Sequence, residues 1–172
     1  MNTVIVFVVN CGSSSVKYQL INMNGEKSAG QRLIERIGMD GSVLKHTPEG
    51  KYTVDINIDV PDHNFGIKLA VDALVNPDYG VIKSMSEIDA VGHRVVHGGE
   101  RFSDSVLVTP DVLEGIAACA ELAPLHNPPN LNGVKACMAL MRRCRRLLFS
   151  IRRFTRACLK SLIYTACLMS CM

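Results

Sequence analysis

Residues 10–17, N-C-G-S-S-S-V-K, place a glycine, three serines and a lysine close together. Successive backbone N–H groups in a tight turn, with hydroxyls and the Lys17 ammonium beside them, can cradle a phosphate. The segment is not a Walker A loop, because the pattern G-x-x-x-x-G-K-[ST] is absent. A plain serine-rich hairpin turn is the alternative interpretation, and composition alone favours it.

A second segment, residues 92–101, reads G-H-R-V-V-H-G-G-E-R and ends a run with strand character. Arg94 can grip a carboxylate or a phosphate through two parallel N–H donors. Glycines at a strand end allow the backbone to bend around a ligand. The alternative is a buried strand end whose histidines hydrogen-bond the backbone. Taken alone, the segment supports both interpretations equally.

A third segment, residues 123–130, reads A-P-L-H-N-P-P-N. Its three prolines stiffen the chain and would hold the imidazole of His126 toward a substrate. A connector between two helices, with Asn127 as a cap, is the alternative. That alternative is favoured when the segment is considered by itself.

The charge of the chain divides sharply along its 172 residues. Residues 1–140 carry 11 basic and all 16 acidic residues, a net charge of −5, whereas residues 141–172 carry 8 basic residues and no acid. All 13 glycines and all 7 prolines also lie before residue 141. The composition excludes collagen, a disordered acidic protein and a small disulfide scaffold. The basic tail suggests a nucleic-acid or membrane-surface segment, with a segment not selected for function as the alternative.

The chain shows no targeting signal in its sequence. The apolar run Val4–Val9 lacks a basic preceding region and is too short for a signal peptide. Seven cysteines without regular spacing indicate reduced thiols. We therefore expect a cytoplasmic protein.

The elements that would position these segments follow from hydrophobic periodicity. Two strands, residues 4–9 and 16–21, flank the serine-rich turn and predict an antiparallel hairpin. Further strands are expected at 52–60 and 88–96, and helices at 64–74, from Thr109 to Leu122, and at 131–141. The fold class is mixed α/β.

Together the three segments resemble the acetokinase family, which comprises acetate, propionate and butyrate kinases. The motifs V-V-N-C-G-S-S-S-V-K-Y-Q-L, D-A-V-G-H-R-V-V-H-G-G-E-R-F and L-A-P-L-H-N-P-P-N occur in the family's order and spacing. The resemblance covers about residues 3–141. It implies an incomplete N-terminal domain of the fold that acetate and sugar kinases share with actin and chaperone ATPases, in which two domains close over a nucleotide.

The resemblance implies the reaction ATP + acetate ⇌ ADP + acetyl phosphate, with Mg²⁺, or alternatively Mn²⁺, as cofactor. By position, Asn10 would help to place the metal, and Ser13, Ser15 and Lys17 would belong to the loop on the phosphate side. The partners are acetate or a similar short carboxylate, acetyl phosphate and ATP. A homodimer is expected of the full-length family, and neither nucleic acid nor a membrane is expected as a partner.

The substrate side of the site is implied in the same way. Arg94 would hold the acetate carboxylate or the transferring phosphoryl group, and His126 would lie in the cleft. Val96 and Leu125 would line the small apolar pocket for the methyl group.

The resemblance stops at Met141. The family continues through V-F-D-T-A-F-H, whose Asp is catalytic, but residues 149–154 here read F-S-I-R-R-F. Written as TTT TCG ATA CGG CGT TTC and read from the third base, these codons give F-D-T-A-F. We therefore expect a partial N-terminal domain at 1–141 and a non-homologous, poorly ordered tail at 142–172, translated out of frame after one base was lost near codon 142. Such a chain would hold no catalytic Asp and would be inactive alone, or would act as a non-catalytic phosphate-binding fragment.

Overall fold

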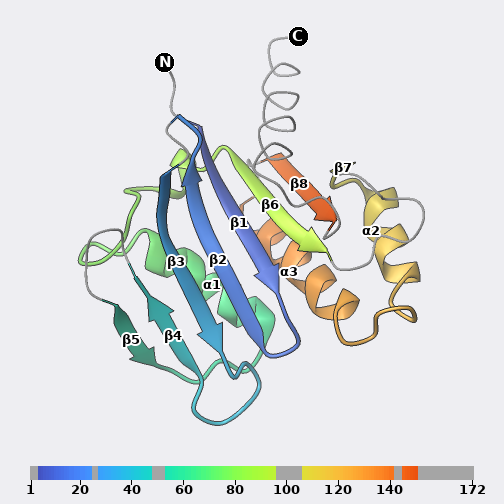
Figure 1. The fold of residues 1–172 in the computed structure, drawn as a ribbon, viewed down its shortest axis with the longest axis horizontal. Coiled ribbons are helices and arrows are strands. Elements are labelled where there is room, and N and C mark those ends of the chain that lie inside the picture. Colours follow the sequence, from blue (N-terminus) through green and yellow to red (C-terminus); the bar gives the residue numbers. More distant parts are fainter. Residues whose placement is uncertain (1–3, 25–26, 48–52, 96–105, 142–144, 151–172) are drawn as a thin grey trace.

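The computed structural model describes residues 4–24, 27–47, 53–95, 106–141 and 145–150. Its strands join into one mixed sheet with the order β5-β4-β3-β2-β1-β6-β8-β7 (Figure 1). The strands are β1 (Ile5–Cys11), β2 (Ser15–Asn22), β3 (Lys27–Glu35), β4 (Val43–His46), β5 (Val54–Asn57), β6 (Ala90–Val95), β7 (Val106–Leu107) and β8 (Arg145–Ser150). The helices are α1 (His63–Leu74), the 3₁₀ turn η1 (Met85–Glu87), α2 (Pro110–Ala118) and α3 (Asn127–Leu140).

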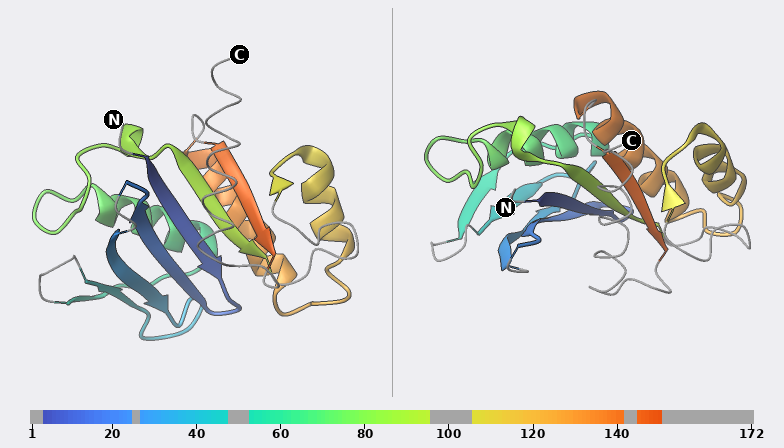
Figure 2. Two further views of the ribbon diagram at one scale, coloured as in Figure 1. Left: turned by 45° about the horizontal axis from the view of Figure 1, so that its top comes forward. Right: turned by 90° about the horizontal axis from the view of Figure 1, so that it is seen from above.

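The sheet changes from antiparallel to parallel at β1. Strands β1 to β5 pair antiparallel in chain order, whereas β6 pairs parallel with β1, and β8 pairs parallel with β6. Helices α1 and α3 lie on the same face of the sheet, and the described residues place no helix on the opposite face (Figure 2). We call the second face the open face.

Strand β1 is buried on both faces, as its continuous apolar run predicts. Phe7 and Val9 belong to the main core under α1 and α3, while Val6 and Val8 pack in a smaller cluster with Ala90 on the open face. The predicted hairpin of β1 and β2 is confirmed, with Cys11 opposite Val16 in the ladder. A strand of this kind fixes the turn at its end rigidly to the core.

The helix starts follow ordinary capping chemistry. The Asp62 carboxylate accepts from the Phe65 N–H at 2.8 Å and begins α1. The Thr109 hydroxyl accepts from the Val112 N–H at 3.3 Å, and Pro110 is the first residue of α2. Helix α3 begins at Asn127, earlier than the predicted residue 131, because a first helical turn tolerates prolines that lack an N–H donor.

Four strands, β3, β4, β7 and β8, were not predicted from the sequence, and others are shorter than predicted. Strand β3 (K-S-A-G-Q-R-L-I-E) mixes polar and apolar residues without strict alternation, and β4 spans only four residues. The run predicted at 52–60 keeps its alternating burial from residue 53 but pairs only over Val54–Asn57. Pairing with neighbours, which a single segment does not reveal, decides these boundaries.

The start of the basic tail is part of the sheet. Arg145–Ser150, at the start of the tail for which poor order was expected, form β8 between β6 and β7. The physical reason is that Leu147, Leu148 and Phe149 have strand propensity and meet the unpaired edge of β6. The other tail residues, 142–144 and 151–172, lie outside the described residues. Within the described residues, no helix is long and apolar enough to cross a lipid bilayer.

Candidate functional site

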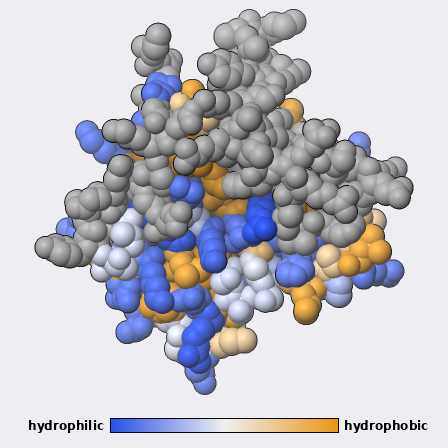
Figure 3. Space-filling view, viewed as in Figure 1, coloured by the Kyte–Doolittle hydropathy of each residue, from blue (hydrophilic) through white to orange (hydrophobic). Residues whose placement is uncertain are grey.

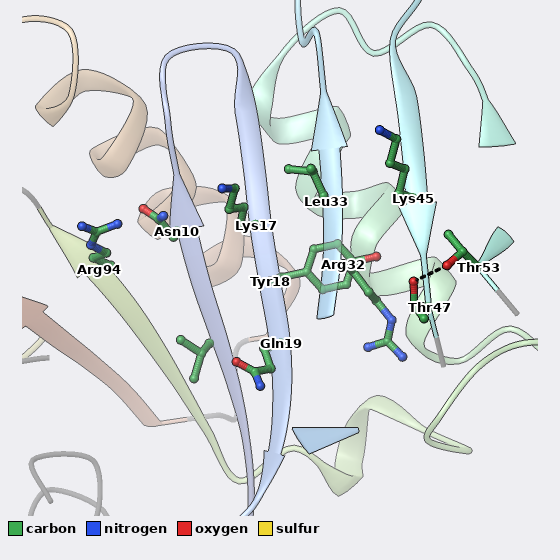
Figure 4. Close-up of a pocket in the computed structure, with 11 residues that line it drawn as sticks. Asn10, Lys17, Tyr18, Gln19, Arg32, Leu33, Lys45, Thr47, Thr53 and Arg94 are labelled. Atoms are coloured by element: carbon green, nitrogen blue, oxygen red, sulfur yellow. Dashed lines mark hydrogen bonds between the residues drawn. The ribbon is translucent and has the colours of Figure 1, made fainter. Parts of the chain in front are cut away.

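One row of side chains crosses the open face of the sheet. The ladder sets Asn10 opposite Lys17, Lys17 opposite Leu33, and Leu33 opposite Lys45. Directly opposed residues of neighbouring strands point to the same face. Figure 4 shows these four side chains in line, with Arg94 at the end beside Asn10.

Arg94 joins this row through the parallel pairing of β1 and β6. The register sets Val9 opposite His93, so the next residues, Asn10 and Arg94, are neighbours on the open face. His93 is 2% exposed and points into the core side. The segment 92–101 thus contributes a buried histidine, His93, on the core side and an arginine, Arg94, on the open face.

The row borders a cavity of about 630 Å³ on the open face. It is lined by Val8, Asn10, Lys17, Tyr18, Gln19, Arg32, Leu33, Lys45, Thr47, Thr53 and Arg94. None of these described lining residues is acidic, and three basic side chains, Lys17, Lys45 and Arg94, lie on the open face. Hydrophilic side chains gather over the strands on this face (Figure 3). A concave surface lined by one sign of charge attracts anions.

Glu35 modifies the far end of the row. Its carboxylate lies 2.7 Å from the Lys45 ammonium, and both side chains are partly exposed. The hydrogen bond and charge of Glu35 raise the pKa of Lys45. The neighbouring hydroxyls of Thr47 and Thr53 bond one another at 2.9 Å. Lys45 thus already has a carboxylate partner, which makes the Arg94–Asn10–Lys17 end the better candidate for binding an anion.

The serine-rich turn lies just beyond this end of the row. The Gly12 N–H donates to the Ser15 carbonyl at 2.7 Å, and the Ile37 N–H donates to the Ser14 carbonyl at 3.0 Å. Ser13 is exposed, and Ser15 is half-buried at the start of β2. A Cβ atom on residue 12 would lie 3.0 Å from the Ser15 hydroxyl oxygen, so the tightness of the turn favours glycine there.

Two residues of the helices contact this turn from the helix-covered side of the sheet. His63, the first residue of α1, places Nε2 2.7 Å from the Gly12 carbonyl oxygen. The Asn130 side-chain amide donates to the Cys11 carbonyl at 2.5 Å. Burial raises the pKa of the Cys11 thiol to about 12, so this cysteine is an inert core residue. No sequence pattern pointed to His63, and Asn130 was noted only as the last residue of the segment 123–130.

The segment 123–130 connects α2 to α3. The buried Asn127 side chain donates to the carbonyls of Ile116 and Cys119, at 3.3 and 3.1 Å, and so ties the start of α3 to the end of α2. Leu125 and His126 are exposed, and neither lines the described cavity. Val96 lies outside the described residues. The structure thus brings together Asn10, Lys17 and Arg94 and leaves Leu125 and His126 apart from them.

A buried polar cluster on the helix-covered side was missed by the sequence analysis, because its members are scattered along the chain. Arg32 Nε and His46 Nε2 are 3.3 Å apart, and His46 Nε2 is 2.8 Å from the Tyr79 carbonyl oxygen. The Arg32 guanidinium also lies over the Tyr18 ring, 5.8 Å from its centroid. Burial, together with the Arg32 charge, lowers the pKa of His46 to about 4. His46 is therefore neutral near pH 7.

The described residues do not by themselves fit a resident Mg²⁺ ion. They bring no three metal-ligating His, Cys, Asp or Glu side chains together. In the cavity, Asn10 offers an amide oxygen, but no described lining residue offers a carboxylate. Carboxylate and phosphate oxygens are the ligands that Mg²⁺ prefers.

Comparison with known proteins identifies the family. Residues 5–167 match the model of the Acetokinase family. The match therefore extends beyond residue 130, where the last of the three motifs ends. An acetate kinase of Desulfitobacterium hafniense (strain Y51) is 54% identical over 136 residues, which cover 79% of this chain and 34% of that protein. The chain spans about a third of the length of the curated relatives it matches.

Solved structures agree with this result. The crystal structure of Porphyromonas gingivalis acetate kinase matches with a TM-score of 0.81 and 45% identity, over 86% of this chain and 37% of that chain. A propionate kinase from Francisella tularensis matches with a TM-score of 0.77 and 35% identity, over 86% and 36% of the two chains. The match to the family model over most of the sequence, together with the similar relatives and solved structures, means that the chain belongs to the Acetokinase family.

Proposed function

We propose that this chain is the phosphate-side part of an acetate kinase. In the reaction, an acetate carboxylate oxygen attacks the γ-phosphorus of ATP, the bond from that phosphorus to the β,γ-bridging oxygen breaks, and ADP leaves. The products are acetyl phosphate and ADP, and the reaction is reversible. The observation that carries this proposal is the row Arg94–Asn10–Lys17 on a cavity whose described lining is not acidic.

Phosphoryl transfer needs alignment and positive charge more than covalent help. Arg94 has a planar fork that suits two oxygens of a carboxylate or phosphoryl group, and Lys17 supplies a compact charge two strands away. Asn10 lies between them and offers both a donor and an acceptor. Ser13 and Ser15 add hydroxyls at the adjoining turn. In this proposal Mg²⁺, or Mn²⁺, comes with the nucleotide phosphates rather than with a protein site.

Acetate is the substrate we propose, since the relatives at 52–58% identity are named acetate kinases. Propionate is the second candidate, because a propionate kinase has a similar structure. One methylene in an apolar pocket changes binding by only about 1–3 kcal/mol, so catalytic efficiencies for both acids must be compared. We also propose that Leu125, His126 and Val96 lie on the substrate side of the site. The whole protein is proposed to be a homodimer in the cytoplasm.

The 172-residue chain itself is proposed to be inactive, with the boundary of its partial domain at residue 141. Residues 149–154 carry no Asp where the family resemblance requires the catalytic carboxylate. In the shifted reading frame, the Asp codon straddles codons 150 and 151, at the end of β8. There β8 runs beside β6, with Phe149 opposite Arg94 and Ser150 opposite Val95. We therefore propose that restoring one base would bring the family's Asp to the end of β8, the strand that pairs with β6.

The test uses two proteins, the 172-residue chain and the product of a gene with one base restored near codon 142. A hydroxamate assay should detect acetyl phosphate with the restored protein and none with the 172-residue chain. Arg94→Ala in the restored protein should lower turnover by about a hundredfold, the order of magnitude expected for loss of a charged transition-state contact. A restored protein without acetate-dependent ATP turnover would refute the proposed reaction.

The reading frame needs its own measurement. Resequencing the gene across codons 138–150 shows whether a base is missing. The intact mass of the natural protein shows which tail is made. A gene that encodes this tail in one uninterrupted frame, together with the matching mass, would contradict the out-of-frame origin and leave the proposed reaction untouched.

A further inference from the structure

The serine-rich turn is held by side chains from two different helices. His63 Nε2 of α1 lies 2.7 Å from the Gly12 carbonyl oxygen, and the Asn130 amide of α3 donates to the Cys11 carbonyl at 2.5 Å. The partners are separated by 51 and 119 residues in the chain, so these are tertiary contacts. A carbonyl only accepts, so His63 carries its proton on Nε2. Two consecutive carbonyls of one turn are thus fixed from the helix-covered side.

Fixing a carbonyl also fixes the N–H group of the same peptide. The peptide bond is planar, and among the described residues none is cis. In a trans peptide the C=O and N–H groups point in opposite directions. Because His63 holds the Gly12 carbonyl toward α1, the Ser13 N–H points away from the helices. Ser13 is the exposed residue of the turn, so its N–H faces the ligand side.

Asn130 stabilises the preceding peptide. The Cys11 carbonyl accepts from Asn130, while the Gly12 N–H of the same peptide donates to the Ser15 carbonyl. Asn130 is only 2% exposed, so its hydrogen bond to the Cys11 carbonyl is shielded from water. One helical turn later, a Cβ atom on Gly133 would collide with the Cys11 sulfur. Glycine there permits the close approach of α3 that brings Asn130 into reach.

The start of α1 is also held in place by specific contacts. Asp62 caps this helix through the Phe65 N–H, and His63 follows as its first residue. Gly66, one turn later, is buried against Ile37 and Val60. The imidazole of His63 therefore projects from a helix end whose position is set by a cap and by the core.

We propose that His63 and Asn130 are positioning residues that set the Ser13 N–H toward a bound phosphate. Neither residue lines the cavity, and each acts through a backbone carbonyl of the turn. The phosphate-binding part of this inference rests on the proposed function. The orientation of the peptide between Gly12 and Ser13 in the free protein does not depend on the proposed function.

The experiment is an NMR titration of the ¹⁵N,¹³C-labelled 172-residue chain with inorganic phosphate. The wild-type Ser13 amide signal should shift on titration. His63→Ala should move the Gly12 carbonyl resonance and weaken phosphate binding about tenfold, the size expected for one lost hydrogen bond of about 1.4 kcal/mol. His63→Gln should restore affinity to within about threefold, because a glutamine amide N–H can donate to the same carbonyl. Asn64→Ala, at the exposed neighbouring position of α1, is the matched control.

Asn130→Ala provides a second, independent variant, with Asn132→Ala on the exposed face of α3 as its control. Asn130→Ala should shift the Cys11 carbonyl and the Ser13 amide, and Asn132→Ala should shift neither.

The outcomes separate the two proposals. If the wild-type chain binds phosphate and both His63 variants bind equally well, the positioning role is refuted while the proposed function stands. If wild-type Ser13 does not respond to phosphate, the proposed phosphate site is refuted. The ligand-free spectra then decide the orientation, and an unchanged Ser13 amide in His63→Ala would overturn it. If His63→Ala does not fold, the positioning role is tested with His63→Gln and with Asn130→Ala against its control Asn132→Ala.

Discussion

The two faces of the sheet use the same strands for different purposes. On β2, Val16, Tyr18 and Leu20 are buried in the core under the helices. The alternate residues Lys17 and Gln19 line the cavity on the open face. One face therefore holds most of the apolar contacts that stabilise the domain, and the other carries the groups that would contact a ligand.

This division teaches that stability and ligand binding can be changed separately here. Because successive residues of a strand point to opposite faces, a substitution on one face leaves the packing of the other largely intact. The serine-rich turn is the exception, since His63 and Asn130 connect it to the helices behind the sheet. The predictions below test this contrast between faces, beginning with the largest expected effect.

Truncation on the helix-covered face should reduce stability most. Leu44 is fully buried under the helices, and Leu44→Ala should lower the free energy of unfolding by about 2–5 kcal/mol. Leu33→Ala is the matched control, since Leu33 is half-buried and lies on the open face. Urea denaturation followed by circular dichroism measures both. Equal losses for the two variants would break the contrast between the faces.

Acid should destabilise the protein through His46. Burial lowers the folded-state pKa of His46 to about 4, so below its ordinary pKa of 6.5 the unfolded chain binds a proton that the folded chain does not. The free energy of unfolding should therefore fall by about 2 kcal/mol between pH 6.5 and pH 4 from this group and then level off.

Urea unfolding at pH 7, 5.5 and 4.5 measures that slope. His46→Gln should flatten it, whereas His126→Gln, at an exposed position, should leave it unchanged. A slope that survives in His46→Gln would assign the acid sensitivity to other groups.

The sequence predicted the residues of the open face better than those of the helix-covered face. Strand β1, the β1–β2 hairpin and the start of α2 at Thr109 follow from local periodicity and turn chemistry, and the structure confirms them. The motif residues Asn10, Lys17 and Arg94 were named from the sequence, and their meeting in one row needed only the register of three strands. The alternation of side chains along each strand therefore predicts well which residues lie together on the open face.

The helix-covered face was predicted less well, for a physical reason. The contacts of His63 with Gly12 and of Arg32 with His46 join residues that are distant or unpatterned in the sequence. Strand β8 was missed because its basic residues hid a short apolar run that only the edge of β6 makes into a strand. Tertiary pairing, rather than local propensity, decides such features.

On the open face, Arg94 should affect binding and not folding. Arg94→Ala should weaken phosphate binding by about 10- to 100-fold, as expected for hydrogen bonds of about 1.5–3 kcal/mol to a charged group. Arg94→Lys should recover only part of this, because an ammonium lacks the two parallel donors. Isothermal titration calorimetry measures the affinity, and urea unfolding should show a change within about 0.5 kcal/mol. A variant that loses stability and affinity together would show that Arg94 supports the fold.

The smallest effect is expected at the far end of the same row. Lys45 and Glu35 form an exposed ion pair at 2.7 Å, and such pairs add little to stability because water and salt screen them. Lys45→Ala should leave the urea midpoint close to that of the wild type, and phosphate affinity should fall much less than for Lys17→Ala. Both comparisons are to be made at low and at high salt, since screening should reduce any difference. If Lys45→Ala weakened phosphate binding as much as Lys17→Ala, the anion site would extend along the whole row, and the boundary that Glu35 sets on it would have to be abandoned.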